Sequence, residues 1–358
     1  MELLSVTMND GVMPRSEIEG KDNSSEDKSN YKVVLMGDMV YNSMRMWQGA
    51  SGISPCDGIV SPAYTVLMPK ISISNGYFAA FFKSPNLINE FRKNSQGMTS
   101  DTWNLKYPQI ETIKICIPAL SEQNRVADLL GTLERRIAKQ AQLVDSLKKY
   151  KRGVMQHIFR QLPSQNGTEW TCVRLGDIFK KVSRRNTDGV IKNVITNSAE
   201  YGLIHQRDFF DKDIAVDGNT ANYYVIENGD FVYNPRKSNS APYGPFNRYT
   251  LSEQGIISPL YTCLVLQADI SPSYLAWYFK SDAWYRYIYD NGSQGVRHDR
   301  VSMTDDLLMG IPVMYPSHVK QLLYADILDM MEARLQATKK ALDLLSKTRD
   351  GYMRQLFI

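Results

Sequence analysis

The chain has 358 residues, of which 43% are hydrophobic and 22% are charged. That length favours two or three domains, and the composition excludes disordered and collagen-like proteins. The formal net charge of +4 permits nucleic acid as a partner but does not require it. No run approaches the roughly 18 apolar residues that cross a bilayer, and the first residues lack a signal-peptide pattern, so we expect a cytoplasmic protein without a membrane partner.

The sequence repeats itself in tandem. Segment 37–42 (Gly-Asp-Met-Val-Tyr-Asn) returns at 229–234 as Gly-Asp-Phe-Val-Tyr-Asn. Further matches follow in the same order: 58–65 with 255–262, 77–84 with 274–281, and the Ser-Gln-Gly of 95–97 with that of 293–295. Because ordered matches of this kind rarely arise by chance, the repeats predict two copies of one structural unit.

Each copy ends in a long polar segment that begins after a proline, Pro118 or Pro316. Apolar residues recur there at alternating steps of four and three, which predicts a heptad seam on a long helix. The seam residues are Leu130, Leu133, Ile137, Val144 and Leu147 in the first copy and Leu328, Met331, Leu335, Leu342 and Leu345 in the second. The polar interruptions also match, since Gln140 corresponds to Thr338. We therefore expect two long helices that pair antiparallel as a coiled-coil spacer.

The remaining parts of the chain mix short β-branched and aromatic runs with Gly, Asn and Pro. Each also holds one predicted amphipathic helix, near 77–93 or 274–289. The predicted fold class is α+β, with two similar domains, two long antiparallel coiled-coil spacer helices and an internal pseudo-twofold symmetry. The expected boundaries are 1–117 for the first domain, 118–160 for its helix, 161–315 for the second domain and 316–358 for its helix.

Motifs of catalysis are missing from the sequence. It contains no G-x-G-x-x-G turn and no Walker A sequence, and Asn234-Pro235 is followed by Arg236 rather than by the Pro-aromatic pair of an amino-methyltransferase. The four histidines have no metal-ligand spacing, and the four cysteines are too far apart for a zinc knuckle. We therefore expect no catalysis, no cofactor and no metal in this chain.

Two basic loops in the second copy are candidates for DNA binding. Arginine and lysine suit phosphates and guanine edges, and asparagine and glutamine suit adenine. The candidates are Arg236, Lys237, Asn239 and Arg248 after the predicted strand that ends at Tyr233, and Gln294, Arg297 and Arg300 further along. At the corresponding places the first copy offers Arg45 and Gln96. The alternative that these are ordinary solvated surface loops stays open.

Three segments resemble the DNA specificity subunit of type I restriction-modification systems. Residues 115–126 carry a Pro-x-x-x-Glu-Gln helix start, residues 170–178 read Trp-x-x-x-x-Leu-Gly-Asp-Ile, and residues 351–357 read Gly-Tyr-Met-Arg-Gln-Leu-Phe. The helix start is the most specific of these signatures. The resemblance covers essentially the whole chain.

The resemblance implies a non-catalytic targeting subunit. Each domain would be a target recognition domain that reads half of a bipartite site in double-stranded DNA, and the long helices would set the distance between the half-sites. Those helices would also dock two methyltransferase subunits, and a restriction subunit with a motor would join them. S-adenosylmethionine, ATP and magnesium would then bind to the partner subunits.

One departure from this pattern concerns the first copy. The stretch that opens the second copy, from Trp170 to near Asn193, has no counterpart in the first, so we expect a first recognition domain that is short at its N-terminus and less stable. Two alternatives remain: a truncated or recombined subunit without full DNA binding, or a coiled-coil scaffold whose domains bind proteins. Salt dependence separates the DNA specificity subunit from the scaffold, because phosphate-dominated binding weakens steeply as salt is added.

Overall fold

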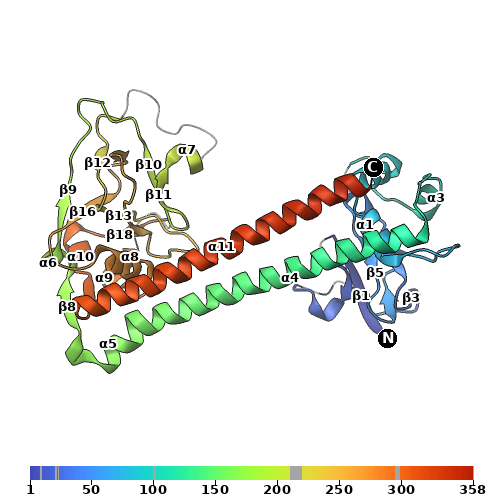
Figure 1. Ribbon diagram of the computed structural model, residues 1–358, viewed down its shortest axis with the longest axis horizontal. Helices are drawn as coiled ribbons and strands as arrows, with labels where there is room; N and C mark the ends of the chain where they lie inside the picture. The colour runs from blue at the N-terminus through green and yellow to red at the C-terminus, as the bar shows by residue number, and fades with distance from the viewer. Residues whose placement is uncertain are drawn as a thin grey trace. The chain divides into compact units, whose positions relative to one another are not determined.

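The computed structural model describes residues 1–8, 10–20, 22, 24–99, 102–209, 220–294 and 299–357. The chain divides into two compact units (Figure 1). Unit 1 comprises residues 1–144 and 337–358, and unit 2 comprises residues 145–336. Both mix helices and strands, which confirms the predicted mixed class.

Unit 1 contains two small sheets and a set of short helices. The first sheet has the order β2 (Gly11–Pro14), β1 (Glu2–Thr7), β6 (Gly58–Val60), β3 (Lys32–Val34), and the second has the order β5 (Ser51–Ile53), β4 (Met39–Asn42), β7 (Tyr64–Leu67). The helices are η1 (Arg15–Glu17), η2 (Met46–Gln48), α1 (Asn75–Phe81), α2 (Pro85–Asn94), α3 (Tyr107–Ile110) and the first part of α4 (Leu120–Gln156).

Unit 2 has a four-stranded sheet and several strand pairs. The sheet order is β14 (Phe246–Arg248), β13 (Phe231–Tyr233), β16 (Thr262–Leu266), β9 (Phe179–Val182). The pairs are β10 (Ile195–Ser198) with β11 (Gly202–His205), β12 (Tyr224–Ile226) with β15 (Gly255–Ile257), β17 (Ser293–Gln294) with β18 (Val301–Ser302), and β19 (Pro312–Tyr315) with β8 (Thr171–Arg174). The helices are the π-helical turn His157–Gln161, α5 (Leu162–Gln165), η5 (Gly167–Glu169), α6 (Leu175–Ile178), α7 (Gln206–Phe209), α8 (Pro272–Lys280), α9 (Tyr285–Asn291), α10 (Asp305–Met309) and the first part of α11 (His318–Leu356).

The repeated sequence segments form the same strand pairs in both units. In unit 1, β4 pairs with β5 and β7, with Tyr41 opposite Thr65; in unit 2, β13 pairs with β14 and β16, with Tyr233 opposite Thr262. The β3–β6 pair of unit 1 likewise corresponds to the β12–β15 pair of unit 2. The shared Gly-Asp-x-Val-Tyr-Asn segment therefore specifies one local topology twice.

The predicted amphipathic helices are each divided in two, contrary to the expectation of one helix per copy. In unit 1, α1 stops before Ser84, whose side chain caps α2 by accepting from the Leu87 N–H, and Pro85 occupies the first turn. Proline lacks the N–H that a continuous helix needs and disfavours a helical residue before it. In unit 2, residues 281–284 separate α8 from α9, although they include no proline.

The helices α4 and α11 have 37 and 39 residues. In unit 1, Gln140 Nε2 donates to the carbonyl of Thr338 at 3.1 Å, and the Arg349 guanidinium lies 3.5 Å from Glu134. From Glu134 to Gln140 along α4, the partner residues run backward from Arg349 to Thr338 along α11, so these two segments are antiparallel. Of the ten predicted seam residues, Leu130, Leu133, Val144, Leu328 and Leu335 are buried, and the other five are half-buried.

A glutamine fastens the start of each long helix. In unit 1, Gln123 Oε1 accepts from the Ser74 N–H at 3.0 Å, and Gln123 Nε2 donates to the Pro118 carbonyl at 2.9 Å. In unit 2, Gln321 makes the same two bonds to the Ser271 N–H at 2.8 Å and the Pro316 carbonyl at 2.9 Å. Both side chains are 2% exposed. The glutamine of the Pro-x-x-x-Glu-Gln signature therefore satisfies buried backbone groups where the helix leaves the globule.

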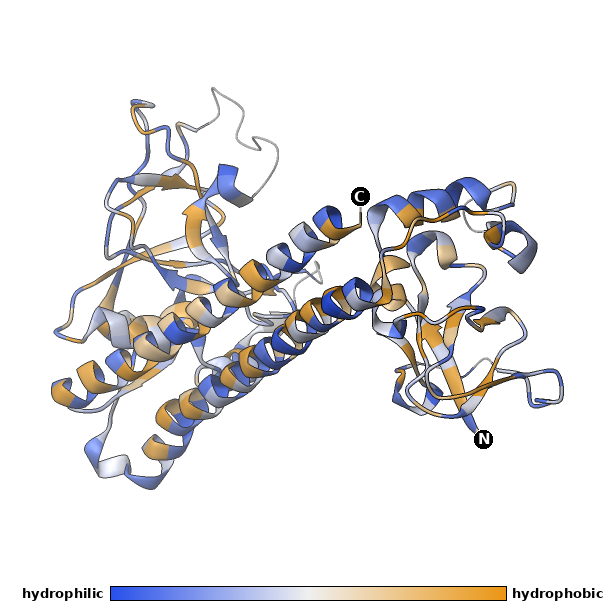
Figure 2. Cartoon of the chain, turned by 45° about the vertical axis from the view of Figure 1, so that its right-hand side comes forward, coloured by the Kyte–Doolittle hydropathy of each residue, from blue (hydrophilic) through white to orange (hydrophobic). Residues whose placement is uncertain are grey.

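Aromatic residues at the far end of each long helix complete the globular cores. Phe357 lies 5.3 Å from the Tyr77 ring and 5.5 Å from the Phe81 ring in unit 1. In unit 2, Phe159 lies 5.5 Å from the Tyr274 ring and packs edge-on against Tyr278. Figure 2 shows the hydropathic pattern, with apolar residues concentrated on strands and alternating with polar ones along α4 and α11.

Candidate nucleic-acid interface

The two candidate loops of unit 2 lie side by side. The Lys237 N–H donates to the Asp299 carbonyl, and the Val301 N–H donates to the Pro235 carbonyl, both at 2.9 Å. Arg236 and Arg300 are opposite each other in an antiparallel bridge. Segments 64 positions apart in the sequence therefore place their basic residues together.

The two paired loops bring the positive charges of two arginines together. Arg236 is exposed and Arg300 half-buried, and neither forms an ion pair with a carboxylate in the part of the chain that the structure describes. Burial raises the pKa of the neighbouring Tyr261, and the positive charges of Arg236 and Arg300 oppose that rise. Like charges directly opposite each other are destabilising, so a phosphate or an electronegative base edge between them would relieve repulsion.

A buried asparagine network holds the start of this loop. Asn234 Oδ1 accepts from the Arg236 N–H at 2.9 Å, and Asn234 Nδ2 donates to the Asn197 carbonyl. Asn197 in turn donates to the Val232 carbonyl and accepts from Asn247 Nδ2 at 2.7 Å. The sequence did not single out Asn197, because its partners are 35 to 50 positions away. The network orients the backbone that carries Arg236.

The other candidates of unit 2 differ in their placement. Asn239 is exposed and Lys237 half-buried in the same loop. Arg248 is opposite Phe231, at the far end of β13 from the loop, and its Nη1 lies 3.5 Å from Ser273 Oγ. The structure therefore does not bring Arg248 to the Arg236 ladder. Gln294 is opposite Val301 in β17, and Arg297 lies outside the described residues.

Unit 1 brings its corresponding segments together in the same way. The Leu105 N–H donates to the Ser43 carbonyl at 2.8 Å, and Gln96 bridges to Asn104. Arg45 and Gln96 are both exposed, the first in the loop after β4 and the second in the bridged segment. The predicted site residues of the first copy are thus carried by paired segments, as in unit 2.

Aromatic residues that the sequence did not single out lie in these same segments. The Trp47 ring packs edge-on against Trp103, with 5.2 Å between centroids, and the Arg92 guanidinium lies 5.8 Å from the Trp47 centroid. A basic group over an aromatic face is an arrangement that also contacts bases and sugars. In the sequence, this arrangement could have been suspected from the two tryptophans, Trp47 and Trp103, which lie in otherwise polar loops.

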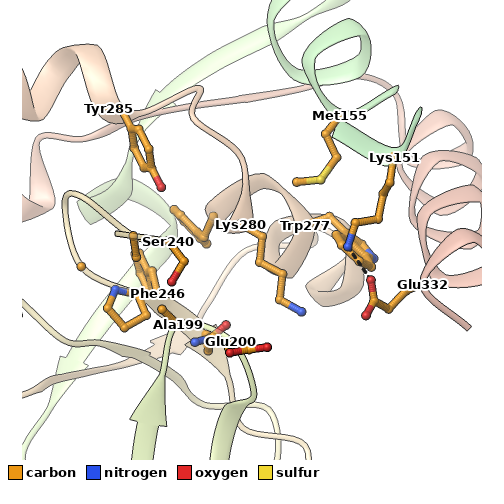
Figure 3. Close-up of a pocket in the computed structure, with 15 residues that line it drawn as sticks. Lys151, Met155, Ala199, Glu200, Ser240, Phe246, Trp277, Lys280, Tyr285 and Glu332 are labelled. Atoms are coloured by element: carbon orange, nitrogen blue, oxygen red, sulfur yellow. Dashed lines mark hydrogen bonds and ion pairs between the residues drawn. The ribbon is translucent and has the colours of Figure 1, made fainter. Parts of the chain in front are cut away.

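A cavity of about 210 Å³ in unit 2 lies between α8 and the long helices (Figure 3). The Lys151 ammonium forms an ion pair with Glu332 at 2.5 Å and lies 5.5 Å from the Trp277 ring. Lys280 lies 4.8 Å from the same ring, and burial lowers the pKa of its ammonium. These contacts fasten α8 to both helices. Because Lys151 and Glu332 pair with each other and both lysines lie on the Trp277 ring, we interpret the cavity as a packing seam.

Two classes of site are not found among the described residues. No group of three or more His, Cys, Asp or Glu residues is arranged to hold a metal ion there. Nor does that part of the chain include a helix long and apolar enough to span a membrane.

Comparison with known proteins finds a similarity over part of the chain. Residues 6–149 match the model of the type I restriction modification DNA specificity domain. Over these residues, the resemblance found in the sequence is confirmed. The specificity subunit of the type I restriction enzyme StySPI from Salmonella potsdam is 27% identical over 186 residues, which cover 46% of this chain and 38% of that relative. The match therefore spans well under half of the relative's length.

Solved structures of such subunits share the fold. The type I restriction-modification S subunit from M. genitalium superposes with a TM-score of 0.55 at 15% identity, over 91% of this chain and 84% of that one. A chain from a structure that describes complex assembly and conformational transition of the type I restriction-modification system gives a TM-score of 0.56 at 16% identity, over 98% and 89%.

Proposed function

We propose that the chain is the DNA specificity subunit of a type I restriction-modification complex and that it is itself non-catalytic. The observation that carries the proposal is the recurrence, in both units, of two loops that are joined by backbone hydrogen bonds and present basic side chains. The match of residues 6–149 to the DNA specificity domain supports it. Each unit contributes one such reading surface.

We assign the reading residues from their chemistry and from their places in the candidate loops. In the second recognition domain, residues 161–315, the DNA contacts are Arg236, Lys237, Asn239, Arg300, Gln294 and Arg297, with Arg248 as the weakest candidate because it faces α8. In the first domain, residues 1–117, Arg45 and Gln96 take this role. Arginine at a phosphate sets the register, and arginine or amide groups at base edges set the sequence.

The helices 118–160 and 316–358 form an antiparallel coiled-coil spacer with pseudo-twofold symmetry. Two ion pairs support this antiparallel pairing. One joins Lys151, late in the first helix, to Glu332, early in the second. The other joins Glu134, early in the first helix, to Arg349, late in the second. Polar seam pairs of this kind fix the register of a coiled coil. The register in turn fixes the separation of the half-sites.

The outer faces of the same helices dock two methyltransferase subunits, and a restriction subunit with a motor joins the complex. Exposed apolar side chains outside the seam support such docking: Leu129 and Leu143 on α4, and Leu322, Leu323, Met330 and Leu344 on α11. S-adenosylmethionine, ATP and magnesium bind to those partners, and the complex works on DNA in the cytoplasm.

The test is co-expression with a type I methyltransferase subunit, followed by mapping of methylated adenines. A bipartite methylated motif is expected. Arg236→Ala should alter recognition of one half-site and leave the other as it was, with a loss of about 1–3 kcal/mol if the arginine contacts a base. The matched control is Arg286→Ala, which removes an exposed arginine of unit 2 that pairs with Asp290 on α9.

Two results would contradict the proposal. If DNA affinity did not fall as salt is added, phosphate contacts would not dominate binding, and the coiled-coil scaffold that binds proteins would be favoured. If both half-sites were read as before in Arg236→Ala, the loop assignment would be wrong.

A further inference from the structure

In unit 2, the segment 170–182 covers one edge of the globule. Its β8 pairs with β19, its α6 follows directly, and its β9 pairs with β16 (Figure 1). The apolar side chains of Leu175, Ile178 and Phe179 are buried in the core. This segment therefore completes two sheets and contributes three core residues.

The same edge of unit 1 lacks such a cover among the described residues. The sheet of β7 ends at β7, whereas the equivalent strand β16 is paired on both sides. Met68, just beyond β7, is 80% exposed. The counterpart of β19, residues 114–117, is not a strand, and Ile115 is 40% exposed where the equivalent Val313 is fully buried.

An open groove of about 810 Å³ lies along residues 114–117 of this edge. Its apolar lining includes Tyr77, Ile115, Val126 and Phe357. Aligning the repeats places Val126 at the position of Tyr324, and in unit 2 Tyr324 stacks on Trp170, the residue before β8. The groove thus occupies the place that residues 170–174 fill in unit 2.

We propose that this groove of unit 1 binds an extended peptide segment whose sequence follows the pattern of residues 170–182. The segment adds a strand beside residues 114–117, places two apolar side chains under α1 and α2, and continues as a strand along the free edge of β7. Backbone hydrogen bonds to such an edge supply affinity, and the pockets for alternate side chains supply specificity. This inference does not depend on DNA binding.

Charge specifies one further feature of the partner. In unit 2, Glu169, just before Trp170, forms an ion pair with Lys320. Unit 1 carries Glu122 where unit 2 carries Lys320. The charge of the groove is therefore reversed at this point, and the fitting segment carries a basic residue in place of Glu169.

The probe is a synthetic peptide of residues 169–182 with the change Glu169→Lys, added to the full chain. In unit 2 Cys172 is opposite Met314, and Cys116 is the counterpart of Met314, so a docked peptide places its cysteine opposite Cys116. Directly opposite residues have Cα atoms about 4.5–5.5 Å apart, within the range for a disulfide. Cys116 is exposed, as the reaction requires.

We expect oxidised glutathione to link the peptide to Cys116, as peptide mapping by mass spectrometry would reveal. A peptide with its cysteine moved one position, to Val173, should link at least fivefold less, because neighbouring side chains of a strand point to opposite faces. A peptide in which Leu175 and Ile178 are both replaced by Asp should also fail to link. Amide exchange of residues 64–67 should slow when the original peptide binds.

The reversed charge at Glu122 allows an independent test of the proposal. The Glu122→Lys chain should prefer the peptide with native Glu169, and the unchanged chain should prefer the Lys peptide, each by about two- to fivefold, the range of an exposed ion pair. Glu122 is exposed, so this variant keeps the fold. Linkage of all three peptides to Cys116 at equal rates, or equal linkage to Cys56, would overturn the proposal. So would a charge preference that the Glu122→Lys change leaves unaltered.

Discussion

The two units share strand pairing but differ in how their helices are packed. Each has a lysine, a glutamate and a second basic residue where α1 or α8 meets the long helices: Lys83, Glu134 and Arg349 in unit 1, and Lys280, Glu332 and Lys151 in unit 2. Between these charged groups, unit 2 has Trp277, and unit 1 has Ala80 beside a groove of about 790 Å³.

This difference shows that the strand topology and the packing density of a unit are determined by different residues. Short repeated segments are enough to specify the strand pairs, because backbone ladders need only the right alternation and turns. The tightness of the core depends on individual side chains, since each space left unfilled lowers stability. The following predictions test that separation, beginning with the largest expected effect.

Replacing Trp277 should make unit 2 resemble unit 1. Trp277 is buried, and its indole N–H donates to Asp329 at 2.8 Å. Trp277→Ala should lower the free energy of unfolding of unit 2 by about 3–5 kcal/mol, measured in urea by the shift of its transition. The matched change Ala80→Trp in unit 1 should cost under about 1.5 kcal/mol, because the groove has room. Equal losses from both changes would contradict the packing difference.

The glutamine fasteners should behave alike in the two units. Gln123→Leu and Gln321→Leu each leave a buried N–H and a carbonyl without their partner, so each should cost about 1–3 kcal/mol in its own unit. Hydrogen exchange of α1 and α8 would report the two losses separately. Replacing the exposed Gln142 of α4 by Leu is the control and should change stability by under about 0.5 kcal/mol.

Unit 1 should open before unit 2. Its β7 edge and residues 114–117 have no covering strand among the described residues, and unpaired backbone raises the population of locally open forms. Limited proteolysis of the full chain should therefore cut within residues 60–118 first. A difference of about 1.4 kcal/mol would appear as a tenfold difference in cleavage rate. Earlier cleavage within residues 170–316 would argue against the weaker first unit.

The Lys151–Glu332 pair should give a small dependence of stability on pH. Burial alone would raise the pKa of Glu332, but hydrogen bonds from Lys151 and Gln336 outweigh it and lower the pKa below the usual 4.5. A carboxylate with a lowered pKa in the folded state stabilises above its unfolded pKa, and that stability is lost as pH falls through the folded value.

Glu332→Gln should accordingly be less stable than the unchanged chain near neutral pH, by under about 1 kcal/mol because water partly screens the pair. The difference should shrink as the pH falls below about 4.5, as urea titrations at several pH values would measure. Lys347→Gln, which removes a fully solvated pair with Asp343, is the control and should give a smaller difference. A difference that stays constant with pH would exclude this ion pair as the cause.

The sequence predicted the features of the fold that depend on a local residue pattern. The repeats indicated the two units. The heptad positions predicted side chains of α4 and α11 that are buried, such as Leu130 and Leu335. The basic loops were also identifiable, because Arg236 and Arg300 are concentrated in polar segments. These features depend on residues close together in the chain.

Other features depended on contacts between distant residues. The pairing of Arg236 with Arg300 and the Asn197 network join segments that no local pattern relates. Arg248 was grouped with the loop because of its charge, but strand pairing places it opposite Phe231 at the other end of β13. The division of the amphipathic helix in unit 1 follows from Pro85, whose effect outweighed the apolar periodicity.

The position of Phe357 in the chain determines when the core of unit 1 can be completed during synthesis. Phe357 packs against Tyr77 and Phe81, so the core of that unit contains a side chain encoded nearly three hundred codons later. During synthesis, unit 2 has most of its partners soon after residue 336 emerges, whereas unit 1 must wait for the last helix. The part translated first is therefore the part completed last, and a chaperone that shields exposed aromatic surface would be needed longest there.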